Sequence, residues 1–173
     1  AIGDLNGDRK LDIVTAAALL RNPHVSVLVN RGNGTFRAKR DFRTGRGPVS
    51  VATGDVNGDG KLDLATANVY QPAKSRAYTV SVLLNRGGGR FQAPRDHRTG
   101  DNPGAIAIGD VNGDRKLDLV TANEGNTVSV LLNRGAGRFH VKRDFRTGPS
   151  PTDVAIGDLN GDGKADLVTP NLH

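Results

Sequence analysis

Carboxylate and amide side chains recur in this sequence at a spacing that suits a cation site. In the stretch Asp55–Asp63, oxygen-bearing side chains occupy positions 1, 3, 5 and 9, and position 7 can offer its backbone carbonyl. A hard cation such as Ca²⁺ takes about six to eight oxygen ligands in flexible geometry, whereas Mg²⁺ demands stricter octahedral coordination. Gly58 and Gly60 allow the backbone to curl so that alternate side chains point inward. The spacing therefore predicts a calcium-binding loop.

The same acidic loop occurs four times, each time after a glycine, at Gly3, Gly54, Gly109 and Gly157. The offsets between copies are 51, 55 and 48 residues, which is the signature of a repeat protein. Twelve of the 18 acidic residues lie in these four loops. Carboxylates packed this closely repel one another unless a cation or a lysine neutralises them. Four copies favour a metal site over a simple turn.

The spacing of the acidic loop is also compatible with two other structures, an EF-hand and an Asx-rich turn. An EF-hand needs a bidentate Glu at position 12 and two flanking helices. Position 12 is a threonine in every copy, and the flanking segments have the alternation of strands. The EF-hand interpretation therefore fails. An Asx-rich turn that only caps a hairpin is the simpler alternative to calcium.

Each repeat has the pattern of four short strands, and no stretch shows helical periodicity. The predicted first strands are 49–53, 105–108 and 154–156, and the second strands are 11–15, 62–66 and 117–121. The third is the Val-Ser-Val-Leu run at Val25, Val80 and Val128, and the fourth is expected to start at Phe36, Phe91 and Phe139. Four strands in about 50 residues predict an all-β protein, a β-propeller of four-stranded blades with about three and a half blades present. A stacked β-solenoid is the alternative.

Composition narrows the classes of protein further. The chain has 173 residues and no Cys, which excludes disulfides, zinc–thiolate sites and cysteine nucleophiles. No apolar run is long enough for a transmembrane helix.

We expect one repeat domain over residues 1–173, with repeats at 1–48, 49–103 and 104–151 and the start of a fourth at 152–173. The first residues lie inside a repeat, so we expect either a fragment of a longer propeller or a protomer completed by its neighbours.

The order of motifs resembles a known family. The acidic loop is followed by a strand, by Val-x-Val-Leu-x-Asn-x-Gly-x-Gly-x-Phe and by Thr-Gly-x-x-Pro, as in the FG-GAP/VCBS repeat. The resemblance covers essentially the whole chain and implies an integrin α-chain-like propeller in a secreted or surface protein. It implies up to four Ca²⁺, one per loop, with the position-7 lysine contributing its carbonyl. The implied metal ligands are Asp4, Asn6, Asp8, Lys10 and Asp12; Asp55, Asn57, Asp59, Lys61 and Asp63; Asp110, Asn112, Asp114, Lys116 and Asp118; and Asp158, Asn160, Asp162, Lys164 and Asp166.

Two loops depart from this pattern at position 6, where Arg9 and Arg115 replace glycine. If this position has positive φ, a non-glycine residue costs about 1 kcal/mol. The guanidinium group also adds positive charge near the ion. We therefore predict weaker calcium binding in the first and third loops than in the second and fourth.

Outside the acidic loops, basic residues clearly outnumber acidic ones. The chain has 24 Lys and Arg against 18 Asp and Glu, a formal net charge of +6. In a four-stranded meander the acidic loops and the Asn-Arg-Gly-x-Gly turns share one end, so we expect Arg31, Arg86 and Arg134 to lie beside the loops. Such a surface attracts an acidic polymer, a glycan or an acidic protein, although it can equally serve solubility. Specific nucleic-acid binding is not expected, because aromatic residues for base stacking make up only 4% of the chain.

The loop Asn68–Thr79 is longer than its counterparts and holds both tyrosines, so it is a second candidate for glycan or protein contact.

Catalysis has little support: the histidines are scattered, and no nucleophile elbow or P-loop is present. We expect no enzyme activity in this segment. The sequence predicts a calcium-binding propeller module of an extracellular or surface protein, acting in adhesion or ligand binding. The alternatives are a structural subunit of a repetitive assembly, self-associating through open blade ends, and an accessory domain of a secreted enzyme.

Overall fold

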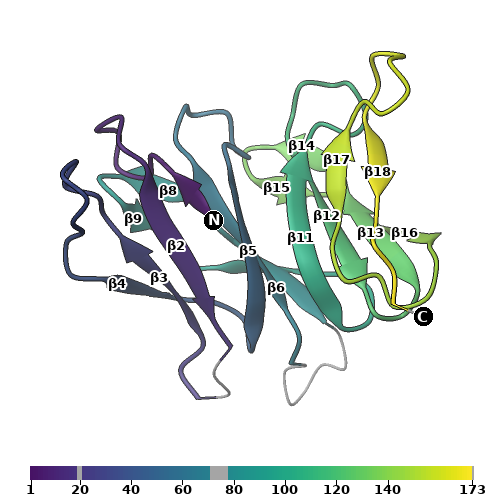
Figure 1. Cartoon of the computed structure of the whole chain (residues 1–173), viewed down its shortest axis with the longest axis horizontal. Helices are drawn as coiled ribbons and strands as arrows, with labels where there is room; N and C mark the ends of the chain where they lie inside the picture. Colours follow the sequence, from purple (N-terminus) through teal and green to yellow (C-terminus); the bar gives the residue numbers. More distant parts are fainter. Residues whose placement is uncertain (19–20, 71–77, 173) are drawn as a thin grey trace.

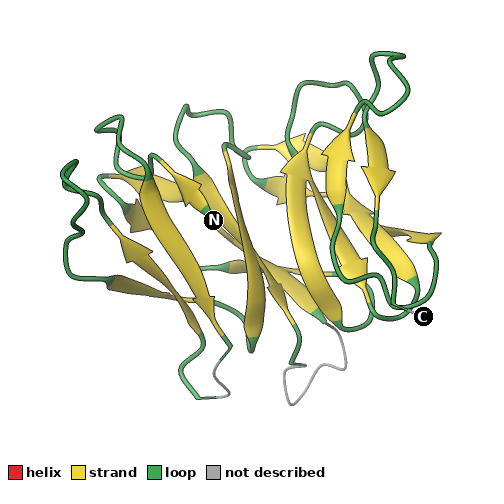
Figure 2. Ribbon diagram, in the orientation of Figure 1, coloured by secondary structure: helices red, strands yellow, loops and turns green. Residues whose placement is uncertain are grey.

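The computed structural model of the protein describes residues 1–18, 21–70 and 78–172. These residues form strands, turns and loops without a helix, which confirms the all-β class (Figure 2). It follows that no helix in the described ranges is able to cross a membrane. The strands form four main sheets, which stand side by side from the N-terminus to the C-terminus in chain order (Figure 1).

Three of the sheets are four-stranded antiparallel meanders. The first consists of β1 (Ile2–Gly3), β2 (Asp12–Ala17), β3 (His24–Leu28) and β4 (Arg40–Arg43). The second consists of β5 (Pro48–Gly54), β6 (Asp63–Asn68), β7 (Thr79–Leu83) and β10 (Arg95–Arg98). The third consists of β11 (Pro103–Gly109), β12 (Asp118–Asn123), β13 (Thr127–Leu131) and β16 (Arg143–Arg146). The fourth has two strands, β17 (Ala155–Gly157) and β18 (Asp166–Val168).

The predicted start of the fourth strand was wrong. Phe36, Phe91 and Phe139 do not begin the outer strands, which start four residues later at Arg40, Arg95 and Arg143. Phe91 and Phe139 instead close two small hairpins, β8 (Asn85–Gly87) with β9 (Arg90–Phe91) and β14 (Asn133–Gly135) with β15 (Arg138–Phe139), and Phe36 forms a single bridge to Asn30. The glycine turn folds the chain back locally, because Gly87 and Gly135 take positive φ.

The hydrophobic core lies between the sheets. Alternation along β7 sends Val80 and Val82 toward the third sheet, where they join a cluster with Leu119 and Leu131. Equivalent clusters fill the junction between the first and second sheets and the junction between the third and fourth sheets. Each sheet therefore buries its apolar residues mainly against its neighbours in sequence.

The inner strands of the first three sheets end close to the next sheet, and this explains the glycine at each of these three ends. A Cβ atom at Gly3 would lie 2.6 Å from Leu62, and one at Gly54 would lie 2.8 Å from Ile108. A Cβ at Gly109 would lie 3.0 Å from Ile156. A larger residue at these positions would force the facing leucine or isoleucine side chain to move. Within the described ranges the sheets form an open stack, not a closed ring.

Candidate metal-binding loops

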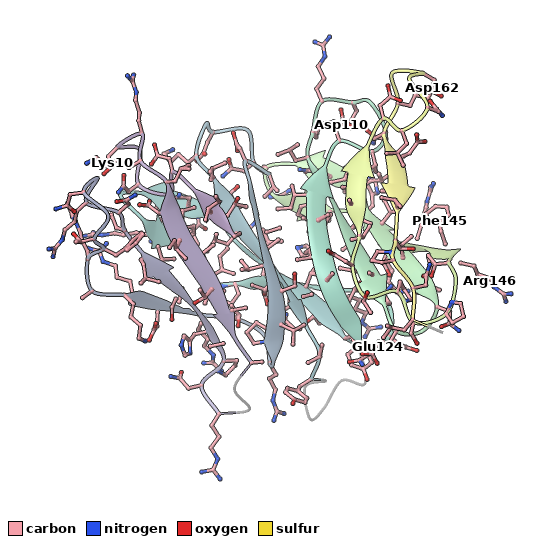
Figure 3. All side chains as sticks on the ribbon, viewed as in Figure 1. Lys10, Asp110, Glu124, Phe145, Arg146 and Asp162 are labelled. Carbon is pink, nitrogen blue, oxygen red and sulfur yellow. The ribbon has the colours of Figure 1, made fainter. Side chains whose placement is uncertain are left out.

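All four acidic loops lie at one end of the sheets. They connect β1 to β2, β5 to β6, β11 to β12 and β17 to β18 (Figure 1). Figure 3 shows Asp110 and Asp162 at this end and Glu124 at the opposite end. The Asn-Arg-Gly-x-Gly turns share the end with the loops, because the Asn85 N–H donates to Asp63 at 2.7 Å. The predicted neighbourhood of loops and turns is therefore present.

Position 1 of each loop organises the backbone around it. In the second loop, Oδ1 of Asp55 accepts hydrogen bonds from the N–H groups of Gly58 and Asp59, at 2.7 and 3.1 Å. Its Oδ2 accepts from the Gly60 N–H at 2.7 Å. The equivalent carboxylates of Asp4, Asp110 and Asp158 bind their loops in the same way. The loop is therefore curled around its first carboxylate, as the Asx-turn interpretation also predicts.

Position 9 is a buried aspartate in the first three loops, and Asp166 of the fourth loop is half-buried. In the second loop, Asp63 has no exposed surface, and it accepts from the N–H groups of Val56 at 3.1 Å and Asn85 at 2.7 Å. Burial raises the pKa of Asp63 to about 6; the two amide bonds oppose this shift, and the charges of Asp59 and Asp55 add to it. Burial also raises the pKa of Asp118 in the third loop, in the same surroundings. The carboxylates of one loop are thus close enough to disfavour one another's charge.

The lysine at position 7 pairs with the aspartate at position 5 in every copy. The Nζ–Oδ2 distances are 3.7 Å for Lys10 with Asp8, 3.1 Å for Lys61 with Asp59, 2.8 Å for Lys116 with Asp114 and 3.9 Å for Lys164 with Asp162. These pairs are exposed, so each is weak. They neutralise part of the loop's negative charge.

The donor set of each loop suits a calcium ion, although the side chains are not gathered around one point. Three carboxylates, one side-chain amide oxygen and one carbonyl lie within nine residues, as Ca²⁺ prefers. Across the described ranges, no group of three or more Asp, Glu, His or Cys side chains is close enough to hold a metal. In the second loop, the Asp59 carboxylate accepts hydrogen bonds from the backbone N–H and from the Nζ of Lys61. A bound ion would have to displace that lysine from the carboxylate.

The backbone at position 6 has positive φ in all four loops. It is 78° at Gly60 and 79° at Gly163, and it is 63° at Arg9 and 64° at Arg115. An L-residue in this region is strained, by roughly 1 kcal/mol relative to glycine. Position 6 therefore has the positive φ on which the prediction of weaker calcium binding in the first and third loops depends.

A functional residue that the sequence interpretation missed links one loop to the next. The Nδ2 group of Asn85, which is 4% exposed, donates to the Leu62 carbonyl in its own loop at 2.8 Å. It also donates to the Leu5 carbonyl of the preceding loop at 2.9 Å. Asn133 makes the same two bonds, at 2.8 Å each, to the carbonyls of Leu117 and Val56. The repetition of Asn after each Val-Ser-Val-Leu run was the available signal.

A buried polar network at the opposite end was also missed. In the second sheet, Asn68 is fully buried and donates from Nδ2 to the hydroxyls of Thr79 and Ser81, at 3.1 and 2.9 Å. The Ser81 hydroxyl accepts from the Gly45 N–H of the first sheet at 2.8 Å and donates to Asp96 at 2.6 Å. The network explains the Thr-Gly motif, because a Cβ at Gly45 would collide with Asn68.

The other predicted contact regions are the long loop with the two tyrosines and the arginines of the glycine turns. Tyr70 is 41% exposed and packs against Gly47, and Tyr78 is half-buried. Residues 71–77 of the predicted long loop, which include Lys74 and Arg76, lie outside the described residues. Arg31, Arg86 and Arg134 are exposed in the turns beside the acidic loops.

The fold and the loops define a class: an all-β array of repeated antiparallel sheets, each with an acidic loop at the same end. The model of the FG-GAP-like repeat matches residues 4–66, 71–121 and 110–169. The chain therefore belongs to the FG-GAP-like repeat family. This confirms the resemblance inferred from the motifs. Among curated protein sequences, none matches this chain.

Solved structures with similar folds are much longer than this chain. A chain in the structure of the Photorhabdus luminescens Tc holotoxin pore is 24% identical, with a TM-score of 0.57; the match covers 97% of this chain and 8% of that one. The V. cholerae biofilm matrix protein Bap1 is 17% identical, with a TM-score of 0.46 and coverage of 96% and 26%. The first likeness supports the fold of the repeated sheets.

Proposed function

We propose that this chain is a calcium-stabilised segment of a β-propeller in an extracellular or surface protein, acting in adhesion or in binding a glycan or protein. The observation that carries the calcium proposal is the fourfold set of loops on one end of the stack. Each loop concentrates three carboxylates, and in three of them the last is fully buried, at Asp12, Asp63 and Asp118. A cation would relieve their mutual repulsion.

Three features support the propeller. The three complete sheets are meanders in chain order, and successive inner strands β5 and β11 lie next to each other. The apolar clusters lie between successive sheets, as they do between blades. The outer strands β4, β10 and β16 are exposed and carry charges, as sheet edges do.

Calcium would act structurally in this proposal. Asp55, Asn57, Asp59, Asp63 and the carbonyl at position 7 would hold it in the second loop, and the matching residues would do so in the others. Binding only to the folded loop stabilises the folded state by mass action. The loop fixes the connection from the first to the second strand of each sheet, so an ion there would hold the sheet end that also carries the linking asparagines.

Thermal unfolding with calcium, with magnesium and with a chelator tests the proposal. We expect the midpoint to rise by several degrees with calcium and much less with magnesium. The variant Asp59→Ala should lose part of this rise, whereas Asp101→Ala, an exposed acid outside the loops, should keep it. An unchanged midpoint with calcium would show that lysines and backbone amides alone hold the loops, and the calcium proposal would fail.

A structural role in a repetitive assembly is the second candidate, and one observation favours it. Ile2 and Leu11 are 62% and 59% exposed on the first sheet, whereas Leu62 and Leu117, the counterparts of Leu11, cover the preceding sheet. At the other end, Leu159 is 65% exposed. Light scattering over a range of concentrations distinguishes the candidates: growth of the particle favours assembly, and a constant monomer contradicts it.

A further inference from the structure

Lysine and arginine have different roles in this molecule. Within residues 1–18, 21–70 and 78–172, every lysine pairs with an aspartate, four in the acidic loops and two, Lys39 and Lys142, on the outer side. No arginine in the same ranges forms an ion pair. Arg40 donates from Nη1 to the Gly88 carbonyl at 3.4 Å. The charges of the arginines in these ranges are therefore not neutralised by a neighbouring acid.

Six of these arginines form a regular array on the outer strands, which we name the arginine ladder. They occupy the first and last positions of β4, β10 and β16, and all six are exposed. The first arginine of each strand lies opposite a valine, and the last lies opposite the first residue of the third strand. Because side chains alternate along a strand, the first and the last arginine of a strand lie on opposite faces of its sheet, and the last arginines of the three strands share one register position. Figure 3 shows Arg146 pointing away from the ribbon. The ladder consists of Arg40, Arg43, Arg95, Arg98, Arg143 and Arg146.

The acids on the same strands do not neutralise the ladder. Asp41 accepts from Ser26 Oγ at 2.7 Å and pairs with Lys39, and Asp144 accepts from Ser129 Oγ at 2.7 Å and pairs with Lys142. Asp96 accepts from Ser81. Each of these aspartates thus accepts a hydrogen bond from a serine of its own sheet, and none of them forms an ion pair with an arginine in the described ranges.

A cleft separates the outer strands of the first and second sheets. Its volume is about 640 Å³, and its lining includes Arg43, Arg46, Asn22 and Asp96. Arg46 follows the Thr-Gly motif, where the next repeat has Asp101. This cleft is therefore the more basic of the two positions between neighbouring outer strands. Two guanidinium groups beside side-chain amide and carboxylate oxygens suit a sugar that carries both an anion and hydroxyl groups.

We infer that the arginine ladder binds a linear acidic polysaccharide, with one sulfate- or carboxylate-bearing sugar seated in the cleft at Arg43 and Arg46. This inference rests on the proposed role in extracellular ligand binding, and it identifies the surface and the chemical class of the ligand. The guanidinium fork matches the planar oxygen pairs of carboxylate and sulfate. A nucleic acid is less suitable, because among the described residues the outer strands expose one large aromatic ring, Phe145.

Binding of dextran sulfate, with neutral dextran as control, tests the inference at about 0.15 M salt, where weak surface attraction is screened. Hyaluronate distinguishes a carboxylate ligand from a sulfate ligand. The ladder variant carries Arg43→Gln, Arg46→Gln and Arg98→Gln. The matched control carries Arg31→Gln, Arg86→Gln and Arg134→Gln, which removes the same charge from the turns beside the acidic loops. Thermal unfolding confirms that both variants fold.

We expect the native chain to bind dextran sulfate or hyaluronate and not dextran, and the ladder variant to bind at least about tenfold more weakly. The matched control should change by less than about threefold. Equal losses in the two variants would overturn the inference, as would absence of binding by the native chain. Equal or tighter binding of a single-stranded DNA of similar charge would overturn the polysaccharide assignment.

The same titrations in calcium and in chelator separate this inference from the proposed function. If calcium stabilises the protein but the ladder variant binds the polysaccharide as the native chain does, the inference about the arginine ladder alone is overturned. Ladder-dependent binding without any calcium effect on unfolding would support the ladder and overturn the calcium proposal alone.

Discussion

The junction between the first and second sheets and the junction between the second and third use the same sequence positions, but one aromatic pair differs. At the first junction, Phe42 packs edge-to-face on Phe91, with ring centroids 5.1 Å apart and an interplanar angle of 76°. At the second, His97 packs on Phe139 at 5.2 Å and 75°. The two ring pairs therefore have nearly the same geometry, and they differ only in whether one ring is a phenyl or an imidazole. An imidazole in this position can take a proton, and a phenyl ring cannot.

The environment of His97 disfavours that proton. The ring is half-buried, and its Nε2 atom has no hydrogen-bond partner in the described part of the chain. Burial lowers the pKa of His97; the Arg95 charge acts in the same direction, and the Asp96 charge opposes it. Acid should therefore weaken the second junction and leave the first unaffected.

The largest expected effect comes from a feature that the two junctions share. Asn85→Ala and Asn133→Ala each leave one buried and one partly buried carbonyl without their partner, so each should lower the free energy of unfolding by about 2–4 kcal/mol. Asn30→Ala, whose Nδ2 bonds only the Leu11 carbonyl, should cost less. Denaturant unfolding measures all three. A clear difference between Asn85→Ala and Asn133→Ala would break the equivalence of the junctions.

The second prediction sharpens the contrast between the junctions. Because the folded pKa of His97 is lowered, the unfolded chain binds more protons below about pH 6.5, and stability falls as the pH falls. His97→Phe should reduce the loss of thermal stability between about pH 7 and pH 5 by a few degrees. Phe42→His should introduce a similar loss at the first junction. Parallel pH profiles for the native chain and His97→Phe would refute the role of this ring.

The third prediction compares the loops at the two junctions through their buried acids. The folded pKa of Asp63 is about 6, against an ordinary value of 3.8, so its contribution to stability is complete below 3.8 and is lost as the pH rises through 6. Burial also raises the pKa of Asp118, so its contribution to stability is lost in the same direction, as the pH rises. In chelator, Asp63→Asn should flatten this part of the pH profile relative to the native chain. Calcium should flatten it as well, because a bound cation favours the carboxylate.

The smallest expected effect concerns position 6 of the loops. Arg115→Gly should stabilise the chelated protein by about 1 kcal/mol, because the residue has a φ of 64°. Gly60→Arg should destabilise it by a similar amount. The same exchanges should strengthen calcium binding in the third loop and weaken it in the second, which calorimetry can measure. Equal affinities before and after exchange would contradict the predicted order of the loops.

The repeat made much of the fold predictable. The fixed spacing of loops, Val-Ser-Val-Leu runs and outer strands gives the strand order directly, because each sheet is built from consecutive residues. The outer strands were misplaced at Phe91 and Phe139, since the glycine turn inserts a small hairpin that has the alternation of a strand.

The candidate site was predictable only within each loop. Its ligand types follow from local spacing, but the pairing of Lys61 with Asp59 depends on side-chain orientation. The link from Asn85 to Leu5 joins residues 80 positions apart, and no local pattern reveals it. The same holds for Ser81 with Gly45, where a hydroxyl that looks solvent-facing in the alternating pattern is fully buried between sheets.

The stacking of sheets on their sequence neighbours also determines how protection from hydrogen exchange should be distributed. β6 and β12 are buried along their whole length, whereas β2 and β18 include exposed residues. In an array with nearest-neighbour contacts, opening begins at the outermost units and reaches the middle last. Amide protons of β6 and β12 should therefore report the global unfolding free energy, and those of β18 should exchange through local fraying of the last sheet.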